Sequence, residues 1–347
     1  MARHVIFLMH GMGDFPKGWS AATQGQLRGL YAKYGVAKSL PFDEIFACEE
    51  ITYSGRFEKL RKQWKAGASA VVRELKKGGL PDNAAAHLLR ADASAANDDF
   101  LRTHLLDLLL YRFNPQVAEE ARTLVARRIQ EVIFPKRGDP PRWSVLAHGL
   151  GTAVAHDSLH AMFTHTAGGR TLMGLAKAQA IVMIANVSRL LEQRTVDVYR
   201  SVVRPGLADQ GICEFYVNIW HEWDPLPRPK AFRPLHDWPD VATRLARPER
   251  FVAAPINAFQ RRNVHALDHY LADPRAHVAI FRALLPLPDA IAEPELTRAI
   301  AAHEATTPFG QFEALQQALK ALQLAEEAGW KQVIDAFTRF FAAVRNV

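Results

Sequence analysis

Residues 143–156 limit the possible folds of this chain more than any other stretch. Their sequence is WSVLAHGLGTAVAH: a short buried strand over 144–147, a turn with two glycines, and a helix that opens at Leu150. An apolar strand without polar alternation is typical of a parallel sheet that is covered on both faces. The stretch therefore predicts one strand–turn–helix unit of an α/β fold.

Other short apolar runs repeat this pattern, with helical spacing between them. Strands are predicted over residues 4–9, 44–53, 178–187, 212–220 and 251–256. Helices are predicted over residues 20–34, 57–77, 100–113, 115–132 and 190–203. Strands that alternate with helices predict a mostly parallel central sheet with helices on both faces.

The predicted strands place one α/β domain at residues 1–285. The chain has a helical pattern from Asp273 onward, and residues 286–347 are expected to form a helical C-terminal extension that packs on the domain. Residues 78–115 precede the central strand and contain the apolar stretch FLRTHLLDLLLYRF. This segment has two interpretations: a helical insertion that covers a pocket as a lid, or a helix of the core.

Composition narrows the class of protein. Apolar residues make up 49% of the 347 residues and charged residues 23%, which is ordinary for a soluble globular chain. The net charge of +7 is scattered, and its densest cluster, within residues 59–77, fits a solvated helix face better than a nucleic-acid site. No run approaches the roughly 18 apolar residues that span a bilayer. We expect no nucleic-acid partner and no stable membrane insertion.

The two cysteines favour a reducing compartment. Cys48 and Cys213 lie in apolar runs without a Cys-x-x-Cys pattern or a neighbouring histidine pair, so buried reduced thiols are expected rather than a disulfide or a metal site. The first apolar run leads into a glycine turn and not into a signal-peptide cleavage site. A cytoplasmic location is expected.

Polar or glycine-rich segments follow several predicted strands. The first strand ends in the turn His10-Gly11-Met12-Gly13-Asp14, the central strand ends at Gly149, Asp224 follows the strand over 212–220, and His265 follows the last strand. Ligands bind at the carboxyl ends of the strands in open α/β sheets. These segments are therefore the candidate site.

Together these segments resemble the α/β-hydrolase superfamily, of the serine esterase or lipase-like type, over about residues 3–284. Ala147-His148-Gly149-Leu150-Gly151 resembles the nucleophile elbow Gly-x-Ser-x-Gly, and His10–Gly13 resembles the turn that contributes an oxyanion N–H. Asp224 resembles the triad acid and His265 the triad base, and the order elbow, Asp, His is the one that this superfamily uses.

The resemblance implies an α/β-hydrolase fold and hydrolysis of a carboxylic ester through an acyl-enzyme. It implies an oxyanion hole built from the backbone N–H groups of Met12 and Leu150, with no metal or organic cofactor. A small ester-like or apolar ligand is the expected partner, and the oligomeric state is left open.

The assignment of the triad acid and base has one rival residue for each role, and a further pair of histidines could be read as a metal site. Glu222 is the rival of Asp224 as the acid, and His269 is the rival of His265 as the base. His156 and His160 are four residues apart and could share a helix face, but they lack a third ligand, so a structural role is expected rather than a metal site.

Glycine at position 149 removes the nucleophile that the resemblance requires. A nucleophile elbow holds its central residue in a strained conformation that glycine adopts at little steric cost, so the fold should persist while the hydroxyl is lost. Neither Ser144, inside the strand, nor Thr152, in the first helical turn, is placed to replace it. The sequence therefore predicts a hydrolase-type protein that is inactive or severely impaired. The alternative is a non-catalytic ligand-binding or scaffold protein on the same fold.

Overall fold

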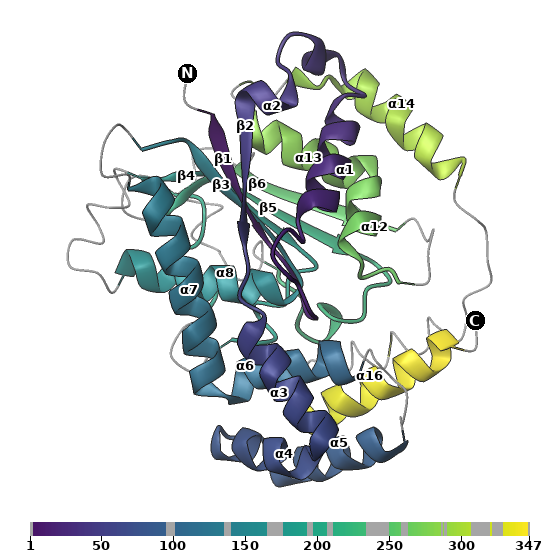
Figure 1. Ribbon diagram of the computed structural model, residues 1–347. Helices are drawn as coiled ribbons and strands as arrows, with labels where there is room; N and C mark the ends of the chain where they lie inside the picture. Colours follow the sequence, from purple (N-terminus) through teal and green to yellow (C-terminus); the bar gives the residue numbers. More distant parts are fainter. Residues whose placement is uncertain are drawn as a thin grey trace.

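The structure is a computed structural model (Figure 1). It describes residues 3–94, 101–134, 140–164, 176–192, 197–206, 211–233, 250–257, 263–285, 287, 290–306, 320 and 329–345.

A six-stranded, all-parallel sheet forms the centre of the molecule, which confirms the predicted α/β class. The strands lie in the order β2-β1-β3-β4-β5-β6. Their bounds are β1 His4–Met9, β2 Phe46–Ile51, β3 Trp143–His148, β4 Ala178–Ile184, β5 Cys213–His221 and β6 Phe251–Ile256. Every residue of β1 and β3 is buried, as the continuous apolar runs in the sequence predict.

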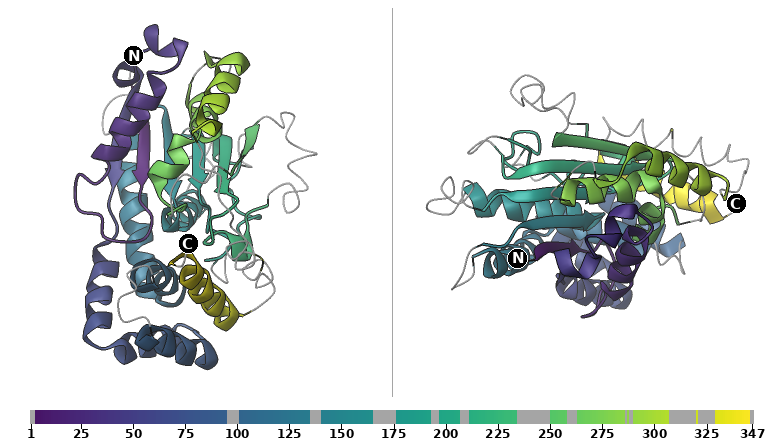
Figure 2. Two further views of the ribbon diagram at one scale, coloured as in Figure 1. Left: turned by 90° about the vertical axis from the view of Figure 1, so that its right-hand side faces the viewer. Right: turned by 90° about the horizontal axis from the view of Figure 1, so that it is seen from above.

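Helices cover both faces of the sheet (Figure 2). Alternate strand residues point to opposite faces, so Phe7 and Val145 join a core with the helices between β2 and β4. Leu8 and Leu146 join a second core with the first helix and the helix that follows β6. The two cores explain why both faces of the central strands are apolar.

The described helices have the following bounds. They are α1 Ala21–Tyr31, η1 Gly35–Lys38, α2 Phe42–Ile45, α3 Gly55–Ala66, α4 Ala68–Lys77, α5 Asp82–Ser94, the π-helical η2 Leu101–Leu105, α6 Leu106–Phe113, α7 Pro115–Ile133, α8 Leu150–Thr164, η3 Arg228–Lys230, α12 Leu267–Ala272, α13 Pro274–Leu284, α14 Glu293–Glu304 and α16 Trp330–Arg345.

The structure differs from the predicted helices at two places. The helix predicted over 57–77 is two helices, α3 and α4, separated by extended backbone at Gly67. The described part of 190–203 forms turns and no helix. There the Glu192 carboxylate accepts from the Val198 amide and the Asp197 carboxylate from the Tyr199 amide. Such local side-chain acceptors compete with the helical hydrogen-bond ladder.

Part of the segment 78–115 packs in the core, and the lid interpretation stays a prediction. Helix α6 is a core helix, because Leu108, Leu109, Leu110 and Tyr111 have no exposed surface. His104 of η2 and Asp107 of α6 contact residues of the candidate site. Figure 1 shows α3, α4, α5, α6 and α16 grouped beyond one end of the strands.

The described helices after residue 286 pack on the α/β domain. Helix α14 contacts α13, and α16 contacts α5. Val333, Ile334 and Phe337 of α16 are buried in the larger core. Residues 307–319 and 321–328 of the helical extension predicted over 286–347 lie outside the described residues. No described helix is both long enough and apolar enough for a membrane span.

Candidate active site

The candidate site lies where the strand order reverses. Strand β2 pairs with one side of β1, whereas β3 pairs with the other side. The turn after β1 and the turn after β3 therefore diverge at the carboxyl ends of two neighbouring strands. Such a switch point is where open α/β sheets bind their ligands.

Gly149 occupies a left-handed conformation in the turn between β3 and α8. Its φ of +52° lies in a region where non-glycine residues are uncommon. The Gly149 amide donates to the Ile184 carbonyl at 3.0 Å, and its carbonyl accepts from the Thr152 hydroxyl at 2.7 Å. These two hydrogen bonds fix the turn to β4 and to α8. The Thr152 hydroxyl is used in the second bond, so it does not point into the site as a free nucleophile.

Asp224 and His265 form a buried hydrogen-bonded pair. The His265 Nδ1 donates to the Asp224 Oδ2 at 2.7 Å, and the two residues are 3% and 0% exposed. The same carboxylate accepts from the Tyr270 hydroxyl at 2.7 Å and from the Leu226 amide at 2.9 Å. Burial by itself raises the pKa of Asp224, but the charge of His265 and these hydrogen bonds hold the pKa below its usual value. The carboxylate is therefore ionised at neutral pH.

The second nitrogen of His265 faces Gly149. When Nδ1 carries the only ring proton, the imidazole presents a lone pair at Nε2. This Nε2 is buried and has no hydrogen-bond partner among the described residues. A Cβ atom added to Gly149 would lie only 2.9 Å from it. The imidazole therefore occupies space that a side chain at position 149 would need.

The Met12 side chain covers the Leu150 amide, which is the candidate oxyanion donor. Its thioether sulfur accepts a hydrogen bond of 3.1 Å from the Leu150 amide, at the N-terminus of α8. The same sulfur would lie 3.3 Å from a Cβ on Gly149. A thioether is a weak acceptor, so a carbonyl or anionic oxygen would be the better partner for this amide once Met12 had turned away.

The rival residues differ in the contacts that they make. Glu222 is exposed, whereas the buried Asp224 carboxylate accepts a hydrogen bond directly from the His265 ring. His269 faces His221, with 3.3 Å between their Nε2 atoms. Asp224 and His265, together with Gly149, are thus the residues that the fold brings together.

The other histidine pair makes separate contacts. His156 pairs with Asp157 at 3.0 Å and His160 with Ser201 at 3.0 Å. In the part of the chain that the structure describes, no three histidine, cysteine or acidic side chains gather as a metal site would require.

Several residues of the site were not found from the sequence. His148 donates from Nε2 to the His265 carbonyl at 2.7 Å and so ties the turn after β3 to the loop that carries His265. His104 places its ring 6.0 Å from that of His265, in an edge-on orientation. Asp107 contacts the turn after β1. The sequence signal for Asp107 is its place as the sole acid within the apolar run of residues 100–113.

Comparisons of this chain with known family models, curated proteins and solved structures found no match. The fold and the geometry of the site are therefore the observations that bear on function.

Buried histidines make the stability of the fold sensitive to mild acid. Burial lowers the pKa of His4, His10 and His277 to about 4 and that of His148 to about 3. Their ordinary value in an unfolded chain is about 6.5. Between these values the unfolded chain binds protons that the folded protein does not, so stability falls as the pH drops from about 6.5 toward 4. Well above pH 6.5 these rings are neutral in both the folded and the unfolded state, so they do not make the free energy of unfolding depend on pH.

We expect the free energy of unfolding, measured in urea at pH 7.5, 6.5, 5.5 and 5.0, to fall below pH 6.5 by about 1.4 kcal/mol per pH unit for each such ring. The variant His277→Gln should show a shallower slope over the same range. A flat profile between pH 6.5 and 5.0 would contradict the neutral, buried state of these histidines.

Proposed function

We propose that this chain is an α/β-hydrolase-type protein that resembles carboxylic ester hydrolases, and that Gly149 in the nucleophile position leaves it inactive or severely impaired. The observation that carries the proposal is the buried, unpartnered Nε2 of His265, which faces Gly149 while Nδ1 bonds to Asp224. An imidazole in this state is a general base without a hydroxyl to deprotonate.

The location of Gly149 supports the same class. It lies in a strand-to-helix turn with a positive φ, and α/β-hydrolases place their nucleophile in such a turn above a parallel sheet. The residues follow one another as elbow, Asp224, His265, which is the order of that superfamily. The ligand proposed for the site is a small ester-like or apolar molecule.

Each residue has a specific chemical role in this proposal. A hydroxyl at position 149 would give its proton to His265 and attack the ester carbonyl. Asp224 would keep the proton on Nδ1 and stabilise the imidazolium that forms. The Leu150 amide, and by resemblance the Met12 amide, would donate to the developing oxyanion, which requires the Met12 side chain to leave its present position.

The test is the variant Gly149→Ser, with Gly149→Ala as the matched control. Both variants place a Cβ near His265 and carry the same backbone strain, but the serine alone supplies a hydroxyl. We expect the serine form to hydrolyse p-nitrophenyl esters at least about 100-fold faster than the alanine form. It should also form a covalent adduct at position 149 with a fluorophosphonate, seen by mass spectrometry. A folded serine form that is inert toward both short and long acyl chains would contradict the proposal.

Met12 favours a second candidate, a non-catalytic ligand-binding or scaffold protein. Its sulfur accepts the hydrogen bond of the Leu150 amide, and the His265 ring lies where a side chain at position 149 would be. The oxyanion donor and the place of the nucleophile are therefore both filled. This candidate predicts that the serine form stays inert while the glycine form binds a ligand or partner. The same pair of variants therefore separates the two functions.

A further inference from the structure

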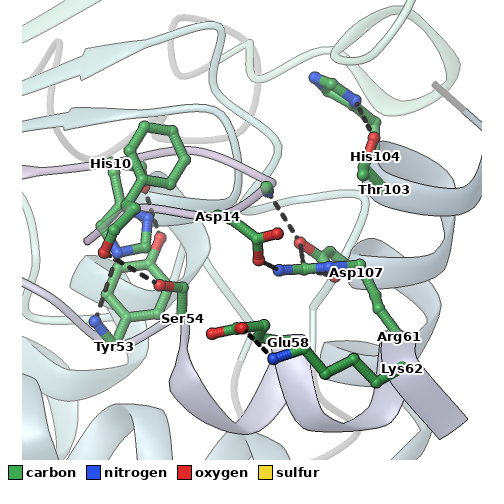
Figure 3. A network of polar contacts seen from close by, with 12 residues as sticks. His10, Asp14, Tyr53, Ser54, Glu58, Arg61, Lys62, Thr103, His104 and Asp107 are labelled. Atoms are coloured by element: carbon green, nitrogen blue, oxygen red, sulfur yellow. Dashed lines mark hydrogen bonds and ion pairs between the residues drawn. The ribbon is translucent and has the colours of Figure 1, made fainter. Parts of the chain in front are cut away.

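Three charged side chains meet beside the turn that follows β1 (Figure 3). The Asp107 carboxylate of α6 accepts a hydrogen bond of 2.9 Å from the Gly13 amide. The Arg61 guanidinium of α3 contacts both oxygens of Asp107 and also the carboxylate of Asp14. Asp107 and Arg61 are 1% and 5% exposed. Solvent therefore screens neither charge.

Net stabilisation is a poor explanation for this arrangement. Removing two charges from water costs about as much as their attraction returns, so a buried ion pair contributes little compared with an apolar pair of similar size. What the pair does supply is a fixed orientation for one peptide group. The peptide between Met12 and Gly13 is held by Asp107, and Gly13 has a φ of +110°.

The held peptide belongs to the turn that the proposed function uses. Met12 contributes the preceding N–H of the chain and also the sulfur that covers the Leu150 amide. A hydrogen bond that fixes this peptide therefore also limits the movement of Met12, which carries both groups. The charge of Asp107 would also repel an oxyanion in this turn, and Arg61 neutralises that charge.

We infer that Asp107, balanced by Arg61, is a positioning residue for the oxyanion turn, so that α6 sets the geometry of the proposed acyl site. The inference rests on the proposed function. Asp107 acts through Gly13 and does not touch the reacting atoms.

This contact should depend on pH near neutrality. Burial raises the pKa of Asp107 to about 7, although Arg61 and the Gly13 amide both lower it. The groups that face this carboxylate in the described structure are Arg61 from α3, Asp14 from the turn and Tyr53 from the segment after β2. An ionised carboxylate is the stronger acceptor. The hold on Gly13 is therefore full above about pH 7 and weakens as the pH falls through this value.

The Gly13 amide can be observed directly by NMR. The sequence contains two Met-Gly pairs, Met12-Gly13 and Met173-Gly174. Labelling methionine with ¹³C at the carbonyl and glycine with ¹⁵N therefore gives two correlated signals, and Met173→Leu removes the second. We expect the Gly13 amide proton to shift with a midpoint near pH 7 in the unaltered glycine protein. The variant Asp107→Asn should abolish this transition, and Asp43→Asn, at an exposed ion pair with Arg28, should leave it unchanged.

The catalytic consequence is measured in the serine form. Adding Asp107→Asn to Gly149→Ser should lower kcat for a p-nitrophenyl ester by about 10- to 100-fold with little change in KM, because a displaced turn weakens interactions made in the transition state. Adding Asp43→Asn should leave kcat unchanged.

The outcomes separate this inference from the proposed function. A Gly13 amide proton without the downfield shift of a donor to a carboxylate overturns the inference even if Asp107→Asn fails to fold, because that measurement needs no variant at Asp107. A lower melting temperature with an unchanged kcat also overturns it, because that result assigns Asp107 a structural role alone. An inert serine form contradicts the proposed function and with it the catalytic role of Asp107, while the amide signal still reports whether the contact exists.

Discussion

Asp224→Asn is expected to lower kcat of the Gly149→Ser form by about 10⁴-fold. In the structure the Asp224 carboxylate accepts from His265 Nδ1, which leaves Nε2 as the lone pair that faces position 149. An asparagine amide in the same place can donate to Nδ1. That contact would move the ring proton to Nε2 and direct it toward the hydroxyl that has to be deprotonated.

Tyr270→Phe is the matched control, because it removes a different hydrogen bond from the same carboxylate oxygen. It should cost about 1 kcal/mol, or less than about tenfold in kcat, because the orientation of His265 is kept. Rates are measured with a p-nitrophenyl ester, and folding is checked by circular dichroism. If kcat of the Asp224→Asn form lies within tenfold of its parent, Asp224 does not hold His265 in the catalytic tautomer.

Gly151→Ala is expected to destabilise the fold by about 3 kcal/mol or more. A Cβ on Gly151 would lie 2.5 Å from the His10 carbonyl oxygen and 3.1 Å from that of Met9. Both contacts are to backbone, so no side-chain rotation can relieve them, and α8 would have to move away from the end of β1. That movement would also disturb the switch point at which the site is built.

The control for this substitution is Gly25→Ala in α1, where an added Cβ meets no atom within 4 Å. It should stabilise the protein by about 1 kcal/mol, because alanine is the better residue inside a helix. Both variants are measured by urea denaturation of the glycine protein. If the two substitutions change the free energy of unfolding by similar amounts, the close approach of α8 to β1 does not constrain the fold.

Much of the fold could be predicted from the sequence because the strands are short apolar runs and the central ones are buried on both faces. The predicted limits of β1 and β6 agree with the structure to the residue, since continuous apolar runs that end in glycine or polar turns have few other structures. Residues 190–203 show the limit of this approach. Their apolar spacing is helical, but Glu192 and Asp197 bind nearby backbone amides instead, and spacing does not report such local competition.

Site residues could be predicted from the sequence where they directly follow a strand, because the end of that strand determines their position. Gly149, Asp224 and His265 each follow a strand, and parallel strands bring such residues to one edge. His148 and Met12 were different. His148 directly precedes position 149 in the sequence, but its bond to the His265 carbonyl depends on a loop 117 residues away. The rotamer that places the Met12 sulfur on the Leu150 amide depends on packing that the local sequence does not encode.

The pairing of α5 with α16 has a consequence for the order of folding. Ala84, Ala85 and Leu88 of α5 are buried in the same core as Val333, Ile334 and Phe337 of α16. About 250 residues separate the two helices, so this pairing carries the large loop-closure cost that slows non-local contacts. On the ribosome α5 emerges long before its partner, with an apolar surface exposed until the last helix follows. The sheet can therefore form well before the helices beyond its carboxyl ends are complete, and aggregation during synthesis is most to be expected from these helices.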